Sequence, residues 1–421
     1  MKKMIYDRLT GRETSLAVIG LGYVGVPVAL RFARCFDVVG YDMDARRIEK
    51  LREKYGAGCG SIRFTSLEEE LSRAAFYIVT VLTPVDERKN PDLTCLVEAT
   101  RTVARYLKRG DYVVYESTVY PGCTEEVCVP LLEKGSGLKL GADFKVGYSP
   151  ERINPNDSEH TFSNTAKIVS ANDGQALDEV ARVYAEVVAA DLCRASGIRV
   201  AEAAKMTENV QRSVNIALMN ELQRLFSRMG IDMGDVIDMA SSKWNFVKYR
   251  PGLGGGHCIP VDPLYLVSAA SKLGVEMPVT SSGCAVNDGM AAYVVRSLLG
   301  AMGSDGRGAR ALLMGVTYKE NIDDIRNSRI AEMVGLLERE GMSVDVTDPH
   351  ADPDKVYAMY GIRPVPALRP PYDLIVVAVA HDEYRGLDDA YFRSISRGAA
   401  LLGDIRGLYK GRIKSLGYWS L

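Results

Sequence analysis

A single cysteine follows three consecutive glycines in the stretch RPGLGGGHCIPVDPLYL, which spans residues 250–266. The glycines at 254–256 permit unusual backbone angles and close approach by a ligand, whereas Pro260 and Pro263 restrict the chain that follows. Most cysteines in folded proteins are inert members of a core. The flanking residues instead indicate a rigid loop that presents Cys258 as a reactive thiol, with Asp262 four residues later.

A thiolate has a definite chemical use where hydride is also removed. It can add to an aldehyde, and the thiohemiacetal can lose a second hydride to give a thioester that water opens to the acid. Such a route needs a general base, stabilisation of an oxyanion and an activated water. Lysine, asparagine, aspartate and glutamate side chains elsewhere in the chain could supply these functions.

A long helix is predicted from about Ala195 to Gly230, because apolar residues recur there at three- and four-residue spacing. Lys205 and Asn209 are one helical turn apart and share a face. Together they could bind a substrate oxygen or a water, although a solvated polar stripe is the alternative. A helix of this length packs two domains together or pairs with its own copy, and we expect a homodimer.

A dinucleotide-binding unit is predicted at residues 16–51, which read as strand, glycine turn, helix and second strand. The glycines of its G-x-G-x-x-G pattern are Gly20, Gly22 and Gly25. They suit a tight turn, close approach to a pyrophosphate and close helix packing. Asp42 ends the second strand, where a carboxylate accepts from ribose hydroxyls, so NAD is favoured over NADP. Arg46 and Arg47 weaken that preference.

Other polar residues follow apolar runs that predict further strands. Thr83, Thr118 and Glu151 stand at such strand ends, where ligands bind in an open parallel sheet. A turn or helix cap is the alternative role for each of them.

The strand and helix alternation starts again at about Gly308, without a second G-x-G-x-x-G pattern. A nucleotide could still bind at the carboxyl edge of this second sheet, where Tyr318, Lys319, Asp348 and His381 would gather. Lys319 is the best placed of these to meet a phosphate.

The composition agrees with small-molecule partners. A chain of 421 residues is too long for one ordinary core, and its net charge of −2 provides no basic field for nucleic acid. Its eight cysteines lack both the density of a disulfide framework and paired zinc-ligand spacing. The polar amino end and the absence of long apolar runs predict neither a signal peptide nor a membrane span. We expect a cytoplasmic protein that binds no nucleic acid, membrane or metal.

The predicted fold class is α/β, with two Rossmann-like parallel-sheet domains joined by a long central helix. Residues 1–195 form the NAD-binding domain, residues 196–300 the helical dimerisation region with the cysteine loop, and residues 301–421 the second Rossmann-like domain.

Five motifs occur together and in order: GLGYVG, STVYPG, YSPERINPND, EAAKMTENVQRSVNIALMNE and GGGHCIPVDPLYL. They resemble those of the UDP-glucose/UDP-N-acetylhexosamine 6-dehydrogenase family, over about residues 15 to 410. The forms SPERINP and KWNF followed by RPGLGGGHCIPVDP most resemble the bacterial and archaeal branch that oxidises UDP-N-acetylglucosamine or UDP-N-acetylgalactosamine to the uronate. That resemblance implies four-electron oxidation at C6 for surface polysaccharide or glycan synthesis.

The resemblance also implies roles for the chemical candidates. Cys258 matches the nucleophile, and Asp262 with Lys205 matches the groups that manage water and protons. Lys205 and Asn209 match the pair that stabilises the oxyanion. Glu151 matches a glutamate assigned to thioester hydrolysis, and Thr118 a residue that holds a water and touches the cofactor.

The binding residues implied by the resemblance form two sets. The NAD set comprises Gly20, Gly22, Tyr23, Val24, Gly25, Asp42, Arg47, Thr83, Pro84, Thr118 and Arg326. The UDP-sugar set comprises Arg152, Ile153, Asn154, Lys205, Asn209, Val247, Tyr249, Arg250, Gly256, Tyr318 and Lys319. Members of the family are three-domain homodimers, which agrees with the long helix.

One position departs from the family pattern. UDP-glucose enzymes have an arginine sixteen residues before the cysteine, and this chain has Ser242 there, followed by Lys243 and Trp244. UDP-glucose is therefore less favoured, and Arg250 or Lys243 is the candidate replacement. UDP-glucose and UDP-N-acetylmannosamine remain alternative substrates. A single-step NAD-dependent hydroxyacid dehydrogenase and a catalytically silent nucleotide-sugar or NAD-binding module are the alternative functions.

Overall fold

The structure is a computed structural model that describes residues 3–56, 61–152, 161–256 and 258–421. The chain divides into two compact units. Unit 1 comprises Met1–Glu208 and Leu264–Val275, and unit 2 comprises Asn209–Pro263 and Glu276–Leu421. The predicted division into segments 1–195, 196–300 and 301–421 stays a prediction.

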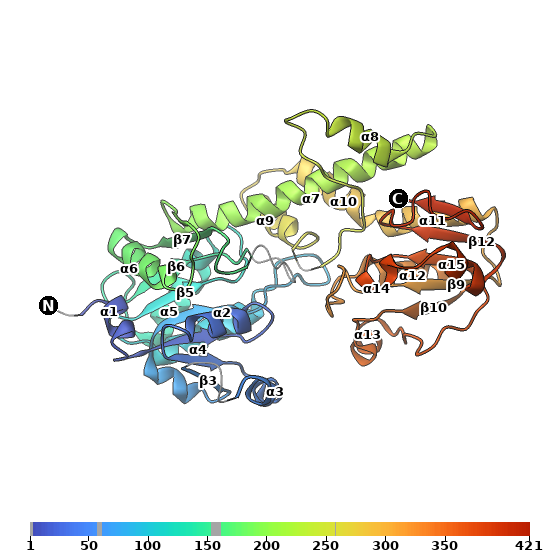
Figure 1. Cartoon of the computed structure of the whole chain (residues 1–421). Coiled ribbons are helices and arrows are strands. Elements are labelled where there is room, and N and C mark those ends of the chain that lie inside the picture. The colour runs from blue at the N-terminus through green and yellow to red at the C-terminus, as the bar shows by residue number, and fades with distance from the viewer. Residues whose placement is uncertain (1–2, 57–60, 153–160, 257) are drawn as a thin grey trace. The chain divides into compact units, whose positions relative to one another are not determined.

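Unit 1 is built on a twisted sheet (Figure 1), whose strands among the described residues run in the order β3-β2-β1-β4-β5-β6-β7-β8. These strands are β1 (Ser15–Ile19), β2 (Val38–Tyr41), β3 (Ile62–Thr65), β4 (Ala74–Val79), β5 (Tyr112–Tyr115), β6 (Lys145–Tyr148), β7 (Lys167–Ala171) and β8 (Leu192–Arg194). Neighbouring strands are parallel except β6 and β7, which are antiparallel. The order reverses between β1 and β4, and such a switch point is where open α/β sheets bind ligands.

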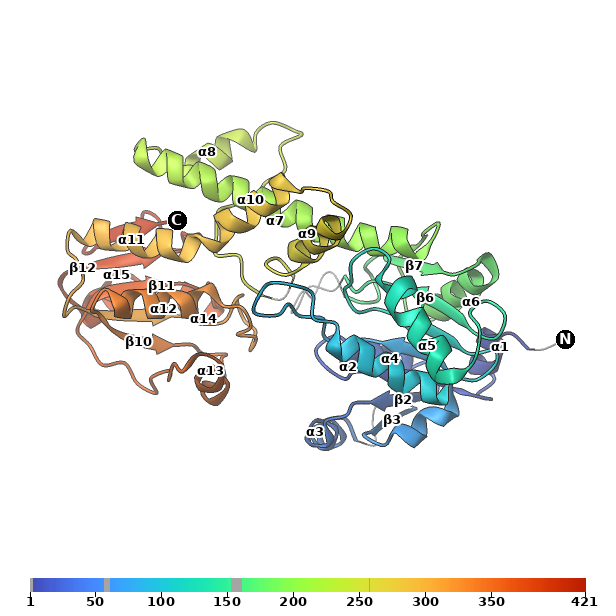
Figure 2. The same cartoon turned by 180° about the vertical axis from the view of Figure 1, so that it is seen from behind.

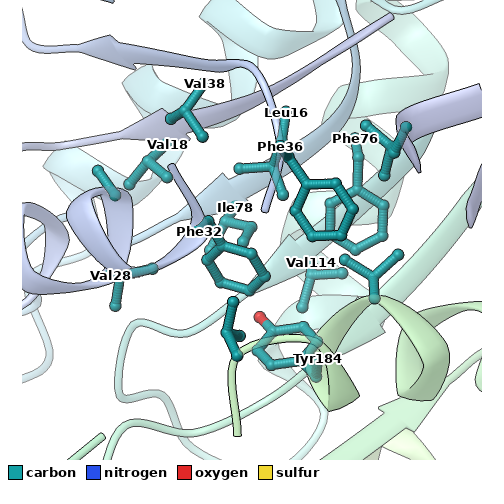
Figure 3. Packing of buried hydrophobic residues seen from close by; sticks show 14 of the residues in the cluster. Leu16, Val18, Val28, Phe32, Phe36, Val38, Phe76, Ile78, Val114 and Tyr184 are labelled. Atoms are coloured by element: carbon teal, nitrogen blue, oxygen red, sulfur yellow. The ribbon is translucent and has the colours of Figure 1, made fainter. Parts of the chain in front are cut away.

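Helices cover both faces of this sheet because its strands alternate their side chains between two cores. On one face, Leu16 and Val18 of β1 pack with Phe32 and Tyr184 (Figure 3). On the other face, Ala17 and Ile19 pack with side chains from the helices behind the sheet, two of which, α4 and α5, pack against each other (Figure 2). The helical elements of unit 1 before the long helix are α1 (Ile5–Thr10), α2 (Gly25–Phe32), α3 (Ala45–Tyr55), η2 (Glu68–Arg73), α4 (Thr94–Tyr106), η3 (Thr124–Cys128), α5 (Val129–Ser136) and α6 (Gly174–Ala185).

Unit 2 contains a second parallel sheet, with the strand order β10-β9-β11-β12-β13 among the described residues. Its strands are β9 (Arg310–Met314), β10 (Ser343–Thr347), β11 (Tyr372–Val377), β12 (Ser396–Asp404) and β13 (Gly417–Ser420). The helices around it are α11 (Met290–Met302), α12 (Arg329–Arg339), α13 (Pro353–Tyr360), α14 (Asp382–Arg385) and α15 (Asp389–Ile395). Its order reverses between β9 and β11, so the segments after these two strands meet at a second switch point.

The predicted long helix is present as α7 (Ile198–Arg228), the long green helix of Figure 1. It begins in unit 1 and continues into unit 2. The remaining helices are α8 (Met233–Ala240), α9 (Asp262–Lys272) and α10 (Pro278–Asp288). The predicted fold class, with two Rossmann-like parallel-sheet domains and a long central helix, is confirmed. In the described part of the chain, no helix combines the length and apolar character of a membrane span.

Candidate active site

The glycine turn between β1 and α2 has three positions with different requirements. Gly20 adopts φ +92°, and a Cβ there would lie 2.7 Å from Val81 Cγ1. A Cβ on Gly25 would lie 1.8 Å from the carbonyl oxygen of Gly20, so the helix packs against the turn only with glycine present. A Cβ added to Gly22 would have no other atom within 4 Å, so the space beside this residue, just before α2, is open. A pyrophosphate fits that cradle, because helix N-termini offer unpaired N–H groups.

Asp42 is held rigidly at the end of β2. Its Oδ2 accepts from the Leu21 N–H at 2.8 Å and lies 3.0 Å from Arg47 Nη1. Its Oδ1 accepts from the Asp44 N–H at 3.0 Å. The carboxylate is therefore fixed beside the glycine turn, as a ribose-binding acid requires. Tyr23 is exposed and Val24 is half-buried in the same turn.

The predicted residues at the ends of β4 and β5 lie together. Thr83 Oγ1 donates to the carbonyl oxygen of Thr118 at 2.7 Å, which ties the two strand ends to each other. The Tyr265 hydroxyl donates to the carbonyl oxygen of Pro84 at 2.9 Å and so connects α9 to the same edge. Thr83 is buried and Thr118 is half-buried.

The segment after β6 is joined to the first turns of α7. Arg152 forms a bidentate ion pair with Glu208, at 2.5 and 3.3 Å, and donates to the Ala166 carbonyl at 2.9 Å. Lys205, three residues before Glu208, is buried in the same helix. Arg152 is thus already engaged by a carboxylate, whereas the predicted substrate residues Ile153 and Asn154 lie outside the described residues.

The start of α7 is also bound to the turn after β5. The Glu202 carboxylate accepts from the N–H groups of Gly122 and Thr124, at 2.6 and 2.9 Å. Burial raises the pKa of Glu202, and these hydrogen bonds oppose the rise. The STVYPG segment and the lysine-bearing face of α7 are therefore fixed to each other.

The cysteine loop of unit 2 is anchored by a buried amide. Asn220 of α7 accepts from the Gly252 N–H at 2.9 Å and donates to the Gly252 carbonyl at 3.2 Å. Its amide nitrogen also donates to Asn287 Oδ1 at 2.9 Å, and Asn287 in turn donates to the Ser213 carbonyl at 3.0 Å. A satisfied buried network of this kind specifies one loop conformation.

Two of the three glycines of the loop, Gly255 and Gly256, pack against Tyr318. Gly256 adopts φ +85°, and a Cβ there would lie 2.7 Å from Tyr318 Cε2. Asn327 donates from its amide nitrogen to the Gly256 carbonyl at 3.1 Å. Side chains on either 255 or 256 would collide with this surface, so glycine is needed for the close approach.

Cys258 is exposed, and its charge acts on two predicted ligand residues, Tyr318 and Arg326. Burial raises the pKa of Tyr318 to about 12, and the negative charges of Asp324 and of a thiolate at Cys258 add to this rise. Tyr318 therefore keeps its O–H at neutral pH and can donate a hydrogen bond. The ion pair with Asp324 raises the pKa of Arg326. Negative charge on Cys258 raises the same pKa further. The loop thus brings Cys258, Tyr318 and Arg326 together.

Asp262 and Asn209 form a second buried pair. The amide nitrogen of Asn209 donates to Asp262 Oδ2, and both side chains are buried. The Asp262 N–H donates to the carbonyl oxygen of Cys258 at 2.9 Å. The predicted oxyanion and proton-handling residues are therefore linked directly, and the backbone at Cys258 is linked to them.

A buried histidine organises the carboxyl edge of the second sheet. His381 Nδ1 accepts from the Asn321 N–H at 3.0 Å, so the ring proton is on Nε2, which lies 3.2 Å from Asp348 Oδ2. Thr317 Oγ1 also lies 3.2 Å from Nε2 and donates to the Lys319 carbonyl at 3.0 Å. The segment that holds Tyr318 and Lys319 is therefore fixed from both sides.

Asp348 completes this arrangement by binding the backbone. Burial opposes its ionisation, but hydrogen bonds from His381 and from the Val316 N–H hold the pKa of Asp348 well below its usual range. Its other oxygen accepts from the N–H groups of His350 and Ala351. The predicted cluster of Tyr318, Lys319, Asp348 and His381 at one sheet edge is present.

The predicted sugar loop before the cysteine is largely exposed. Tyr249 donates from its hydroxyl to Gln211 Oε1 at 2.9 Å, and Arg250 lies 3.3 Å from Asp238. Val247 is exposed. Ser242 stands where the sequence departs from the family pattern, and its hydroxyl donates to the Met239 carbonyl at 2.7 Å. Exposed ion pairs contribute little to stability, so Arg250 can exchange Asp238 for a ligand at small cost.

Comparison with known proteins identifies the family. Residues 14–188 match the NAD binding domain of the UDP-glucose/GDP-mannose dehydrogenase family, residues 199–289 its central domain and residues 312–411 its UDP binding domain. The chain belongs to the UDP-glucose/GDP-mannose dehydrogenase family. The resemblance and the NAD cofactor predicted from the sequence are confirmed by these matches.

Individual family members are similar over nearly the whole chain. A UDP-N-acetyl-D-glucosamine 6-dehydrogenase of Pseudomonas aeruginosa is 44% identical, covering 94% of this chain and 97% of that protein. An enzyme of the same name from Salmonella typhi is 43% identical, covering 94% and 96%. The solved structure of a UDP-D-ManNAc dehydrogenase from Pyrococcus horikoshii is 29% identical, covers 96% of this chain and 98% of that one, and has a TM-score of 0.87.

Several residues that support the family's candidate site were missed by sequence reasoning. They are Glu116, Lys167, Glu202, Asn220 and Asn287. Glu116 and Lys167 were detectable as charged residues bordering apolar strand runs. The asparagines gave no comparable signal, because polar residues are common along helices.

A pair of glycine variants tests the cofactor cradle. We expect Gly22→Ala to fold normally, since its Cβ meets no protein atom, but to bind NAD at least about tenfold more weakly because the methyl group would occupy the pyrophosphate position. Gly25→Ala should lower the melting temperature as well. Calorimetric NAD titration and thermal melting measure both effects, and unchanged NAD affinity in Gly22→Ala would contradict this placement.

A histidine variant tests the edge of the second sheet. We expect His381→Ala to weaken UDP binding by about tenfold, because the 317–321 segment loses a buried hydrogen-bond partner on each side. NAD affinity should not change. His350→Ala, whose side chain pairs with Glu383 near the surface, is the control. Equal UDP affinity in His381→Ala and wild type would show that the histidine does not position the nucleotide segment.

Proposed function

We propose that this chain is an NAD-dependent UDP-N-acetylhexosamine 6-dehydrogenase that oxidises the C6 hydroxymethyl group to the uronic acid. The observation that supports this most directly is the position of Cys258. Its loop is anchored by Asn220 and packed on Tyr318, so the thiol is presented beside the segment that holds the nucleotide candidates. A single-step dehydrogenase has no use for a thiol held in this way.

The proposed reaction draws on groups from several segments of the chain. Cys258 attacks the aldehyde carbon, and its sulfur stays bonded to that carbon until water releases the acid. Lys205 and Asn209 stabilise the oxyanion, while Asp262, which the Asn209 amide contacts, exchanges protons with water. Glu151 serves thioester hydrolysis, and Thr118 holds a water.

The open cradle at Gly22 supports NAD as the partner in hydride transfer. Bound there, NAD supplies the hydride acceptor for both oxidation steps. The residues proposed to hold it are Gly20, Gly22, Tyr23, Val24, Gly25, Asp42, Arg47, Thr83, Pro84, Thr118 and Arg326. Asp42 favours NAD because its fixed carboxylate would repel a 2′-phosphate.

The UDP-sugar is proposed to use groups from the carboxyl edge of the second sheet and from the cysteine loop. Lys319 meets a phosphate, and the protonated Tyr318 donates to the ligand. The other residues proposed are Arg152, Ile153, Asn154, Lys205, Asn209, Val247, Tyr249, Arg250 and Gly256. Arg152 would have to share its guanidinium between the substrate and Glu208.

UDP-N-acetylglucosamine is the favoured sugar. The two bacterial relatives at 43% and 44% identity are named for it, whereas the solved structure named for UDP-D-ManNAc is 29% identical. UDP-N-acetylgalactosamine differs from it only at C4. The product would serve surface polysaccharide or glycan synthesis, and we propose a cytoplasmic location.

A homodimer through α7 is also proposed. Leu218 and Leu225 are exposed on one side of the helix, seven residues apart. Met229 is exposed just after the helix ends, and Trp244 is 92% exposed beyond α8. Apolar residues gathered in this way on a helix favour burial against a second copy.

The function is tested by NADH formation from a panel of UDP-sugars. We expect UDP-N-acetylglucosamine or its C4 epimer to give two NADH per uronate, because a primary alcohol loses four electrons in becoming an acid. Cys258→Ser should stop at the aldehyde or lose activity. Complete oxidation by Cys258→Ser would remove the proposed nucleophile, one NADH per product would favour a hydroxyacid dehydrogenase, and binding without NADH would favour a silent module.

The dimer is tested by placing a charge on the apolar side of α7. Leu225→Glu should sediment as a monomer, because a desolvated carboxylate would oppose burial of that face. Leu273→Glu, an equally simple change at an exposed leucine of unit 1, should leave the sedimentation of the wild-type protein unchanged. A wild-type protein that sediments as a monomer would contradict the proposed assembly.

A further inference from the structure

A lysine is enclosed inside unit 1 next to the proposed hydrolytic glutamate. Lys167 begins β7, and its side chain is only 5% exposed. Its Nζ lies 3.1 Å from Glu116 Oε2 and 3.8 Å from Glu151 Oε2, and it donates to the Pro150 carbonyl at 3.3 Å. One ammonium group therefore faces two carboxylates that come from the ends of different strands.

Aromatic rings and one further hydrogen bond complete the surroundings of Lys167. Its ammonium lies 4.9 Å from the centre of the Phe162 ring and 5.4 Å from the centre of the Tyr184 ring. The Tyr184 hydroxyl donates to Glu116 Oε1, the oxygen that does not face the lysine. Both carboxylate oxygens of Glu116 are thus bound by groups inside the protein, and the role of Glu116 is to hold Lys167.

The two carboxylates differ in exposure, which separates their roles. Burial raises the pKa of Glu116, Lys167 opposes that rise and Glu151 adds to it. A buried ion pair needs only one carboxylate for its lysine, and charges are costly to bury without a partner. Glu151, by contrast, keeps 12% of its side chain exposed, whereas the Glu116 side chain is completely enclosed.

Both oxygens of Glu151 have fixed neighbours. Oε1 accepts from the Arg152 N–H at 2.6 Å, and Oε2 faces Lys167. These two contacts set the orientation of the carboxylate. Arg152 also carries the ion pair with Glu208, which is the other charged pair next to this segment.

We propose that Lys167 is a positioning residue for thioester hydrolysis: held by Glu116, it fixes the carboxylate of Glu151 and balances its charge. The inference rests on the proposed function, in which Glu151 serves hydrolysis. In that step the water oxygen bonds to the thioester carbon, Glu151 takes the water proton, and the carbon–sulfur bond breaks so that Cys258 leaves as a thiolate. No oxidant or reductant is needed, so this step is separate from both hydride transfers.

The test compares two variants that differ only at Lys167. Glu116→Gln keeps the lysine beside Glu151, and the glutamine can still accept from it. The double variant Glu116→Gln/Lys167→Met removes the ammonium and leaves no unpaired buried charge at 116, which favours folding. Each protein is mixed rapidly with NAD and UDP-N-acetylglucosamine, NADH is followed by absorbance, and quenched samples are examined for a uronyl group on the Cys258 peptide by mass spectrometry.

We expect the double variant to form about two NADH per active site in the first turnover, and then to turn over about a hundredfold more slowly than Glu116→Gln. A uronyl thioester should accumulate on Cys258, as it should in Glu151→Gln. Glu116→Gln should accumulate none. An equal loss of first-turnover and steady-state rates in the double variant, or hydrolysis at the Glu116→Gln rate, would overturn the role of Lys167.

The same experiment tests the proposed function separately. Two NADH and free uronate from the wild-type enzyme support that function, and the results with the variants then decide the role of Lys167. Lack of NADH from the wild type would overturn the proposed function and, with it, the role given to Lys167.

Discussion

The backbone of the cysteine loop depends on one buried amide. Asn220 pairs with both the N–H and the carbonyl of Gly252, as a neighbouring strand would, and Asn287 fixes the orientation of that amide. A glycine-rich loop without such a partner would adopt many conformations, since glycine loses more backbone freedom on folding than any other residue. The anchor therefore gives the exposed Cys258 a defined position, and the close packing of Gly256 on Tyr318 adds a second constraint on the loop.

The same principle applies at three other places, where a buried partner holds a residue that is proposed to meet ligand. Asp42 is fixed by backbone N–H groups, the 317–321 segment by His381 and Asp348, and Glu151 by Lys167. The supporting His381 and Lys167 are themselves buried. Catalysis benefits because orientation is established before the substrate binds.

Local signals in the sequence predict much of this arrangement. Apolar runs that end in polar residues predict the strands, and the flanking glycines and prolines are sufficient to single out Cys258. The supporting contacts could not be predicted, because they join residues far apart in the chain. Asn220 is 32 residues from Gly252, and Lys167 is 51 residues from Glu116. No periodic pattern in the sequence indicates that such residues are partners. A lysine in a strand is therefore predicted to be an exposed edge residue unless its buried partners are known.

The chemistry proposed for this chain depends on attack by Cys258 at C6 of a UDP-N-acetylhexosamine. A crystal structure of the enzyme with UDP-N-acetylglucosamine and NAD tests this most directly. We expect the Cys258 sulfur about 3–3.5 Å from C6, the separation of a reactive pair, with the diphosphate near Lys319. A bound sugar whose C6 points away from Cys258, with the nucleotide held elsewhere, would contradict the proposed chemistry.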